Sequence, residues 1–525
     1  MKRTFLAAAL CLSSVYATPK IKANHARNAA SYASPLAPNS GVAPGSRFVV
    51  VGEDLGPADP DPAAAVTVKV EINGAAFDAQ VVSASRREVV AVLSASAPAG
   101  DGKVILTFAG ESAETPIVVK DRAVGLYASG AYGSGAAVAT NADDGAAITL
   151  LAPAHPGHRV RLRATGFGAN LDGEIEVRAG SEAAANVTVT RVEDQPGLDT
   201  IAFDVPAKAD GCFVPVAVRT GGVWTNFVTL AVAPERARCS SPTIAAADLD
   251  RIASGERKEI RTGSTTASRM VTSVEGIEMV SDSVSGSFQK VRFEDYTNGS
   301  QFQGDFAFGS CFVPNFNDIL PADDPNLPQF ESHPLNTGEL SLSGPKGNVN
   351  LGKAHGTFSV ALGNGFNIPL PPGIPAPPSS LYLETGTYRF RSTPGDDIGA
   401  FDVEFRHNPA IWNNASSITS IDRAANLTLT WTGGGANDIV VITGTSAPDS
   451  IGDIHYSRTF VCVAKASAGT FTVPSYILSQ LPASAAETGV LGVLSVSEPK
   501  SFTADGLDTA SVSTVRTAMQ QASYR

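Results

Sequence analysis

The sequence has 525 residues, enough for about three or four domains at roughly 150 residues each. Its net charge of −12 gives it an acidic surface, which repels phosphate backbones and anionic lipids and argues against binding to nucleic acid or a membrane surface. Glycine (49) and proline (34) are plentiful, methionine (4) is scarce and 43% of the residues are hydrophobic, which favours folded strands joined by turns over long helices or disorder.

The first residues predict export. Two basic residues precede an apolar run at 5–12, and small residues at 15–17 resemble a cleavage site. This order is typical of a secretory signal peptide, which we expect to be removed after Ala17. Lipid attachment at Cys11 is disfavoured because the preceding Leu10 is not the small residue that such processing needs. No later apolar run approaches the ~18 residues of a membrane span.

Two stretches of the chain share one pattern. Residues 44–56 and 156–168 both begin Pro-Gly-x-Arg, continue with apolar residues at alternate positions, and end in a large apolar residue followed by glycine. Pro-Gly supplies a turn, and the alternation indicates a half-buried strand. Asn73-Gly74, between alternating apolar residues, predicts a tight hairpin. With further short strands at the spacing of a sandwich, we expect two tandem units of one β-rich fold.

These stretches carry a resemblance to a known family. The order Ala-Ala-Ser-Tyr at 29–32, Pro-Gly at 44–45, Gly-x-x-Leu-Gly at 52–56 and Val-x-Ile-Asn-Gly at 70–74 resembles the IPT/TIG group of immunoglobulin-like domains. Over residues 27–240 the chain is similar to tandem domains of uncharacterised exported bacterial proteins. The resemblance implies extracellular sandwiches with recognition or spacer roles, and it transfers no catalytic residue. The C-terminal half is also similar to parts of uncharacterised exported proteins.

The rest of the chain is again rich in strand patterns. Ser241-Pro242 opens a predicted short helix at 244–253, and two proline-rich loops interrupt the following strands, one of them a polyproline tract at 369–378. We therefore predict an all-β protein with two tandem immunoglobulin-like β-sandwiches, a short connecting helix and a larger β-rich C-terminal half. The predicted parts are a signal peptide (1–17), sandwich 1 (18–120), sandwich 2 (121–240), a helical connector (241–255), a β-rich domain (256–395) and a C-terminal sandwich-like domain (396–525).

The four cysteines that follow the signal peptide suggest two disulfides, with three possible pairings. We predict Cys212–Cys239, which a hairpin would bring together, and Cys311–Cys462, which would make one unit of residues 256–525. Zinc is the competing interpretation, but no Cys-x-x-Cys and no Cys-His pair at ligand spacing occurs.

Catalytic motifs are missing from the sequence. There is no Gly-x-Ser-x-Gly and no His-Glu-x-x-His, and the Gly-Phe-Gly at 166–168 belongs to the repeat rather than to a dinucleotide loop. His155 and His158 flank a Pro-Gly turn and are interpreted as surface residues. The alternative is a carbohydrate-active or other hydrolase domain in 256–525, in which two carboxylates meet in a cleft.

Calcium is the one ligand with any support, because hard cations prefer loop carboxylates. The weak candidates are Asp59, Asp61, Asp143 and Asp144; otherwise no metal or cofactor is predicted. We therefore expect an exported, non-enzymatic recognition, adhesion or scaffold protein of the cell surface or extracellular space. Its partner would be an extracellular protein or a polysaccharide.

Overall fold

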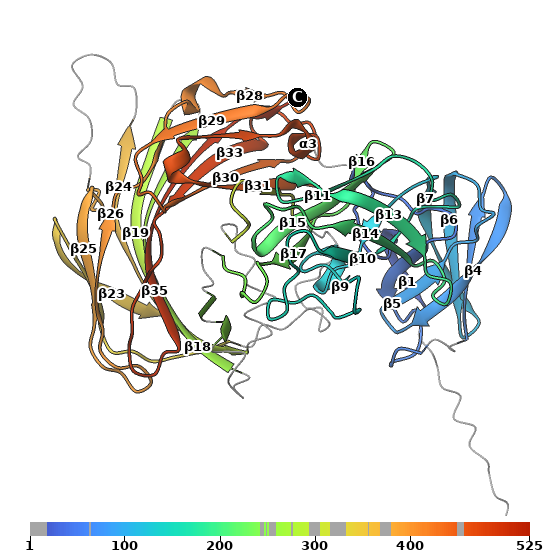
Figure 1. The fold of residues 1–525 in the computed structure, drawn as a ribbon, viewed down its shortest axis with the longest axis horizontal. Helices are drawn as coiled ribbons and strands as arrows, with labels where there is room; N and C mark the ends of the chain where they lie inside the picture. Colours follow the sequence, from blue (N-terminus) through green and yellow to red (C-terminus); the bar gives the residue numbers. More distant parts are fainter. Residues whose placement is uncertain are drawn as a thin grey trace, which may run out of the picture.

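The computed structural model describes residues 18–61, 65–241, 246–247, 249–250, 259–274, 277–292, 305–315, 332–354, 356–367, 380–448 and 456–525. The predicted signal peptide and the polyproline tract lie outside these residues. The protein is all-β, as predicted. In Figure 1 the first sandwich (blue) lies at one end, the second sandwich (teal to green) in the middle, and the C-terminal half (yellow to red) at the other end.

The first sandwich is closed by one strand that takes part in both of its layers. Its strands are β1 (Lys20–Asn28), β2 (Arg47–Glu53), β3 (Val66–Ile72), β4 (Ala75–Ala84), β5 (Glu88–Val92), β6 (Gly100–Phe108) and β7 (Glu111–Val119). β4 pairs with β3 up to Ala79 and with β5 from Gln80 onward, and the pairing with β5 contains a bulge between Val81 and Ser83. Asn73 and Gly74 both have positive φ and form the two-residue turn between β3 and β4. The predicted hairpin is therefore confirmed.

The second sandwich repeats the two-layer arrangement. Its elements are β8 (Gly125–Leu126), η1 (Ala131–Gly133), β9 (Ala139–Asn141), β10 (Arg159–Thr165), β11 (Ile175–Ala179), β12 (Glu182–Ala183), β13 (Ala185–Arg191), β14 (Asp199–Asp204), β15 (Gly211–Thr220), β16 (Val223–Trp224) and β17 (Val228–Val232). One layer contains β13, β14, β10, β8 and β9, and the other contains β12, β11, β15, β16 and β17. Leu55 and Phe167, the equivalent large apolar residues of the repeat, are both fully buried. The repeat thus encodes the same core position twice.

Buried hydrogen bonds join the two sandwiches. The Asn28 side-chain amide donates to the Ala123 carbonyl at 2.7 Å, and its Oδ1 accepts the backbone N–H groups of Ala30 and Ser31, each at 2.9 Å. Gly166 has φ +106°, and a Cβ there would collide with the same Ala123 carbonyl. The linker between the sandwiches is therefore held by close backbone packing as well as by these bonds.

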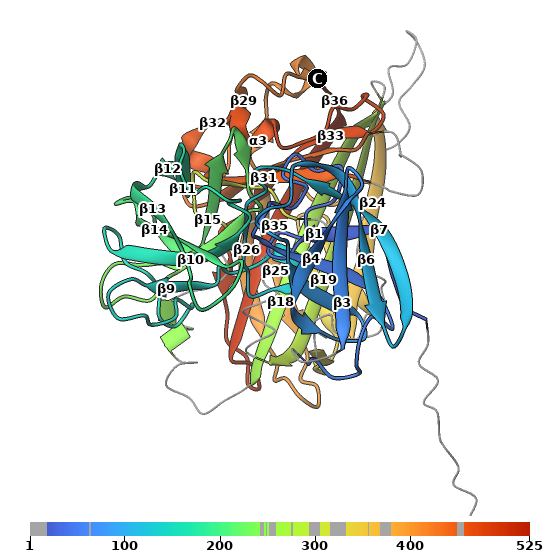
Figure 2. The ribbon, with the colours of Figure 1, turned by 90° about the vertical axis from the view of Figure 1, so that its right-hand side faces the viewer.

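The C-terminal half is built on a single 14-stranded sheet. Its elements are β18 (Glu259–Val274), β19 (Ile277–Arg292), β20 (Cys311–Phe312), β21 (Ser332–Pro334), β22 (Leu340–Gly344), β23 (Gly347–Ala354), β24 (Thr357–Asn367), β25 (Gly386–Ser392), β26 (Asp402–His407), β27 (Ile411–Trp412), η2 (Ala415–Ser417), β28 (Ser420–Ile421), β29 (Leu427–Thr432), β30 (Ile439–Ser446), β31 (Arg458–Lys465), η3 (Ala466–Ala468), β32 (Thr470–Val473), α3 (Ser475–Leu478), β33 (Gly489–Val496), β34 (Lys500–Ser501), β35 (Thr509–Gln521) and β36 (Ser523–Tyr524). At the centre of the sheet β18 is antiparallel to β19 and parallel to β35 (Figures 1 and 2). Both predicted parts, 256–395 and 396–525, contribute strands to this sheet.

Two apolar cores lie along the 14-stranded sheet. One contains residues of β18, β19, β22 to β26 and β35, among them Phe288 and Phe390. The other lies around β30, β31 and β33 and extends into the second sandwich through Phe213 and Trp224. The Trp224 ring lies 5.0 Å from that of Tyr476 on α3, so the second sandwich packs directly on the C-terminal half. Between them, residues 246–247 and 249–250 of the predicted connector are helical.

Candidate functional site

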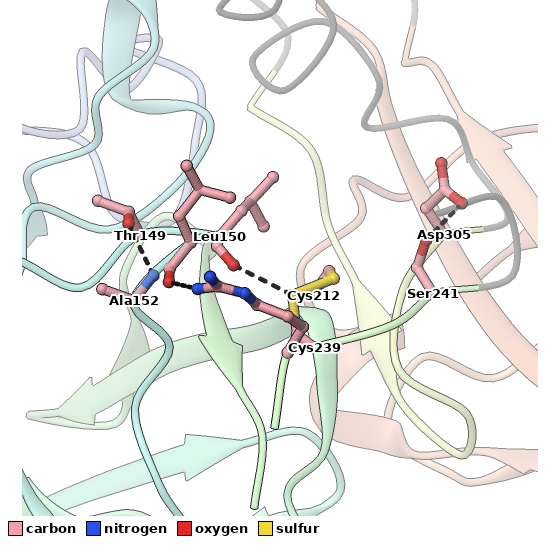
Figure 3. The surroundings of a disulfide bond; sticks show 9 residues. Thr149, Leu150, Ala152, Cys212, Cys239, Ser241 and Asp305 are labelled. Atoms are coloured by element: carbon pink, nitrogen blue, oxygen red, sulfur yellow. Dashed lines mark hydrogen bonds between the residues drawn. A yellow bond between two sulfur atoms is a disulfide. The ribbon is translucent and has the colours of Figure 1, made fainter. Parts of the chain in front are cut away.

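Both predicted disulfides are present, Cys212–Cys239 and Cys311–Cys462. The first ties the segment after β17 to the start of β15, and its Cys239 sulfur lies 3.8 Å from the Leu150 carbonyl oxygen (Figure 3). Further along this segment, the Ser241 hydroxyl donates to Asp305 at 3.2 Å (Figure 3). The disulfide therefore fixes the chain where it leaves the second sandwich.

A pocket of about 720 Å³ opens beside this fixed segment. Its wall comes from residues between positions 141 and 160, from residues 236–238, and from Ala246 and Asp250 of the connector. Its lining is rich in alanine and also includes Ile148, Leu151 and several polar residues. This is a size at which pockets hold small ligands.

His155 and His158, which the sequence placed on a surface turn, both line this pocket. Their rings meet edge to face at 5.3 Å. His155 Nδ1 lies 2.9 Å from the Ala233 carbonyl oxygen, and because a carbonyl can only accept, Nδ1 carries the proton. His158 Nε2 lies 3.2 Å from a Glu235 carboxylate oxygen. Within the ranges that the structure describes, no three His, Cys, Asp or Glu side chains gather as a metal site would require.

Two arginines border the pocket and differ in their partners. Arg238 donates to Asp250 at 2.9 Å and also to the Leu151 carbonyl, which links the pocket wall to the connector. Arg236 is exposed, has a positive φ of 62° and makes no hydrogen bond or ion pair with any part of the described chain. The pocket lining therefore includes one arginine that has no side-chain partner among the residues that the structure describes.

The four aspartates predicted as calcium candidates lie in two different sandwiches. Asp59 and Asp61 are exposed in the loop after β2 of the first sandwich. Asp143 and Asp144 are exposed in a turn after β9 of the second sandwich, where Asp144 accepts the Ala146 N–H at 2.9 Å and also borders the pocket. The two pairs are not brought together, and calcium binding by either pair stays a prediction.

The C-terminal half contains a buried ion pair that the sequence did not reveal. Asp282 on β19 has a side chain with 0% exposure, and Arg269 on β18 donates to its two oxygens at 2.7 and 2.8 Å. The backbone N–H groups of Tyr382 and Leu383 donate to one of these oxygens at 2.7 and 2.8 Å. All hydrogen bonds of this carboxylate are structural, and they anchor the segment before β25 to the long hairpin.

His407 on β26 lies next to this ion pair and is 2% exposed. Its Nδ1 has no hydrogen-bond partner among the described residues, and its ring lies edge to face against Tyr388 at 6.3 Å. Burial, reinforced by the positive charge of Arg269, lowers the pKa of His407 to about 4. The imidazole is therefore neutral at pH 7 and faces the core rather than a cleft.

No helix in the described ranges has the length and apolar character needed to cross a membrane. No protein-family model matches the chain, and no curated protein matches its sequence.

Solved immunoglobulin-domain structures show a distant likeness. A tandem of domains from titin is 7% identical over 70% of this chain and 94% of that chain, with a TM-score of 0.14. The full ectodomain of mouse nectin-like molecule 4 is 11% identical over 70% of this chain and 95% of that chain, with a TM-score of 0.15. Immunoglobulin domains 1–5 of Sidekick-1 are 9% identical over 96% of this chain and 100% of that chain, with a TM-score of 0.13. At such TM-scores the likeness carries no functional argument, and the architecture rests on the sheets themselves.

Proposed function

We propose that the chain is an exported recognition or scaffold protein without enzymatic activity, which acts at the cell surface or outside the cell. The observation that carries this proposal is a contrast between two charged residues, one bound within the protein and one at the pocket. The buried carboxylate of the C-terminal half, Asp282, is bound by Arg269 and two backbone N–H groups, whereas Arg236 in the pocket lining has no partner within the described part of the chain. An arginine in a pocket lining that the described residues leave unpaired suits ligand binding better than catalysis.

Export is supported by the predicted signal peptide and by two disulfides, which persist mainly in oxidising compartments. The tandem sandwiches, joined through Asn28 and packed on the C-terminal half through Trp224, suit a protein that holds its binding surfaces in a fixed arrangement. The likeness of residues 27–240 to IPT/TIG domains is part of this proposal.

Retention of residues 18–525 on cell-envelope fractions, with soluble products monitored in the same tubes, tests the proposal. We expect retention without product release. Arg236→Glu should weaken retention about tenfold, equivalent to about 1.4 kcal/mol, if the pocket carries the binding. The matched control is Arg406→Glu, because Arg406 is an exposed arginine far from the pocket on β26. Release of soluble products would contradict the non-enzymatic proposal.

A further inference from the structure

The outward face of the four adjacent strands β35, β18, β19 and β24 carries no charged side chain. Residues alternate along these strands, and the inward positions, such as Ala267, Val284, Val512 and Phe358, are buried in the core. The residues that alternate with them, here called the outward face, are Thr262, Ser264, Thr266, Ser268, Met270, Thr272 and Val274 of β18, Ile277, Met279, Ser281, Ser283, Ser285, Ser287, Gln289 and Val291 of β19, Thr509, Ser511, Ser513, Val515, Thr517, Met519 and Gln521 of β35, and Thr357, Ser359, Ala361 and Asn364 of β24. Ile260, at the start of β18, shares this side of the strand but is buried.

The charged residues of the same strands all share the inward side. They are Glu259, Arg261, Arg269, Glu278, Asp282, Lys290, Arg292 and Arg516. The usual pattern is the reverse, because charges are normally placed on the solvent side of a sheet. In a chain of net charge −12, an exposed face without any charge is therefore a specific feature that calls for a partner.

Hydroxyl groups form regular rows across this face. The backbone register places Ser511, Ser264, Ser287 and Thr357 side by side in one row, and Ser513, Thr266, Ser285 and Ser359 in the next. Neighbours within a row are about 4.8 Å apart and the rows about 7 Å apart, as strand geometry requires. Of these side chains, Ser264, Ser285, Thr357 and Ser359 are exposed. The rows thus offer a lattice of groups that both donate and accept hydrogen bonds.

The outward face is apolar at its end near the turn between β18 and β19. Met270, Met279 and Ile277 are 48%, 41% and 40% exposed. Met519 joins them, because Thr272 of β18 is the register partner of both Met279 and Met519. Every methionine of the chain apart from Met1 therefore lies on this one face. Clustered exposed apolar residues mark binding surfaces, and methionine adapts its shape to the partner.

From these features we propose that the outward face binds an extended, uncharged polysaccharide. A charged polymer would be met by opposite charges, and the face has none. A protein partner would call for the tryptophan, tyrosine and arginine anchors that dominate protein interfaces, and none of these three residue types occurs among the residues of the face named above. A neutral sugar chain has hydroxyls that match the rows and C–H surfaces that match the methionines. β18, with 16 residues, extends for roughly 50 Å, a length that suits a polymer rather than a small ligand.

This inference rests on the proposed recognition function and names its ligand class. The test places two carboxylates on the face by the double substitution Ser283→Glu and Ser285→Glu, at two exposed positions of β19. The matched control is Thr188→Glu with Thr190→Glu, which has the same spacing on the exposed β13 of the second sandwich. Circular dichroism and melting temperature would show that both double variants fold.

The probes are microcrystalline cellulose, chitin and the acidic polymer polygalacturonate, each at 0.1 M and 1 M sodium chloride. We expect wild type and control to be retained on cellulose or chitin equally at both salt concentrations, because no ion pair is screened. The two glutamates on the face should weaken retention about tenfold or more, since burying an unpaired charge against a neutral polymer is costly.

Two results would overturn the inference. One is that neither neutral polymer retains the wild type, and the other is that the glutamates on the face leave retention unchanged. If the chain is still retained on envelope fractions in either case, the recognition function stands and only its assignment to this face is wrong. Retention on polygalacturonate alone would likewise refute an uncharged ligand.

Discussion

Acidification should destabilise the C-terminal half through His407. The pKa of this residue is about 4 in the folded protein, against 6.5 as the ordinary value that an unfolded chain would show. As the pH falls below 6.5, the unfolded chain binds a proton at this position while the folded chain does not. Stability is therefore lost between pH 6.5 and about 4, and no further loss arises from this group below that. The difference between the two pKa values corresponds to about 3 kcal/mol.

Guanidinium unfolding at pH 7.5, 5.5 and 4.0 measures this loss in the wild type and in His407→Phe. Fluorescence can follow the C-terminal half through Trp412 and Trp431, which are both buried there. Phenylalanine keeps a ring against Tyr388 but binds no proton. Carboxylates titrate in both proteins and cancel in the comparison. The wild type should lose about 3 kcal/mol relative to the variant between pH 7.5 and 4.0. An equal stability difference at all three pH values would refute the argument.

Four further substitutions test the links that hold parts of the fold together. Cys311→Ala should cost about 5 kcal/mol and Cys212→Ala about 3.5 kcal/mol in denaturant unfolding, because the Cys311–Cys462 disulfide closes the longer loop; the reverse order would contradict this. Gly166→Ala should lower the melting temperature of the sandwiches by more than 5 °C, because its Cβ meets the Ala123 carbonyl; an unchanged melting temperature would show that the linker can move. Asn28→Ala should make the linker between the sandwiches sensitive to limited proteolysis, and equal resistance would refute its joining role.

The sandwiches were the predictable part of the fold. Their strands have one buried face, so alternation of apolar and polar residues is visible along β3, whose buried and exposed positions alternate. The Asn73-Gly74 turn and the repeated Leu55 and Phe167 positions are local signals of the same kind. Both predicted disulfides are present, but only one has a local signal, because Cys212 and Cys239 flank a recognisable hairpin.

The long central strands were harder to predict. β18 and β19 carry serine and threonine outward and a mixture of charged, small and apolar residues inward, so no hydrophobic period shows their full length of 16 residues each. The parallel partner β35 is remote in sequence, and such pairings leave no local pattern. Phe306 lies outside any strand, because residues 305–308 form a loop, yet its side chain is buried in the core.

The candidate site could be predicted only in part, because it too depends on contacts between residues that are remote in sequence. His155 and His158 were noted, but the pocket needs Arg236 and the connector, which only the fold brings beside them. The uncharged outward face could have been suspected from the run of alternate serines in residues 281–287. Its meaning, however, depends on which side of the sheet is buried.

The position of β35 also determines when the C-terminal half can fold. β18 and β35 are adjacent in the sheet, but about 250 residues separate them along the chain (Figure 1). During synthesis β18 and β19 are complete long before their neighbour exists, and one edge of their hairpin stays open until β35 arrives. An open strand edge invites pairing with other chains. Serine and threonine on one side of the hairpin and charged residues on the other disfavour its aggregation before β35 is synthesised. The same composition later forms the surface of the folded sheet.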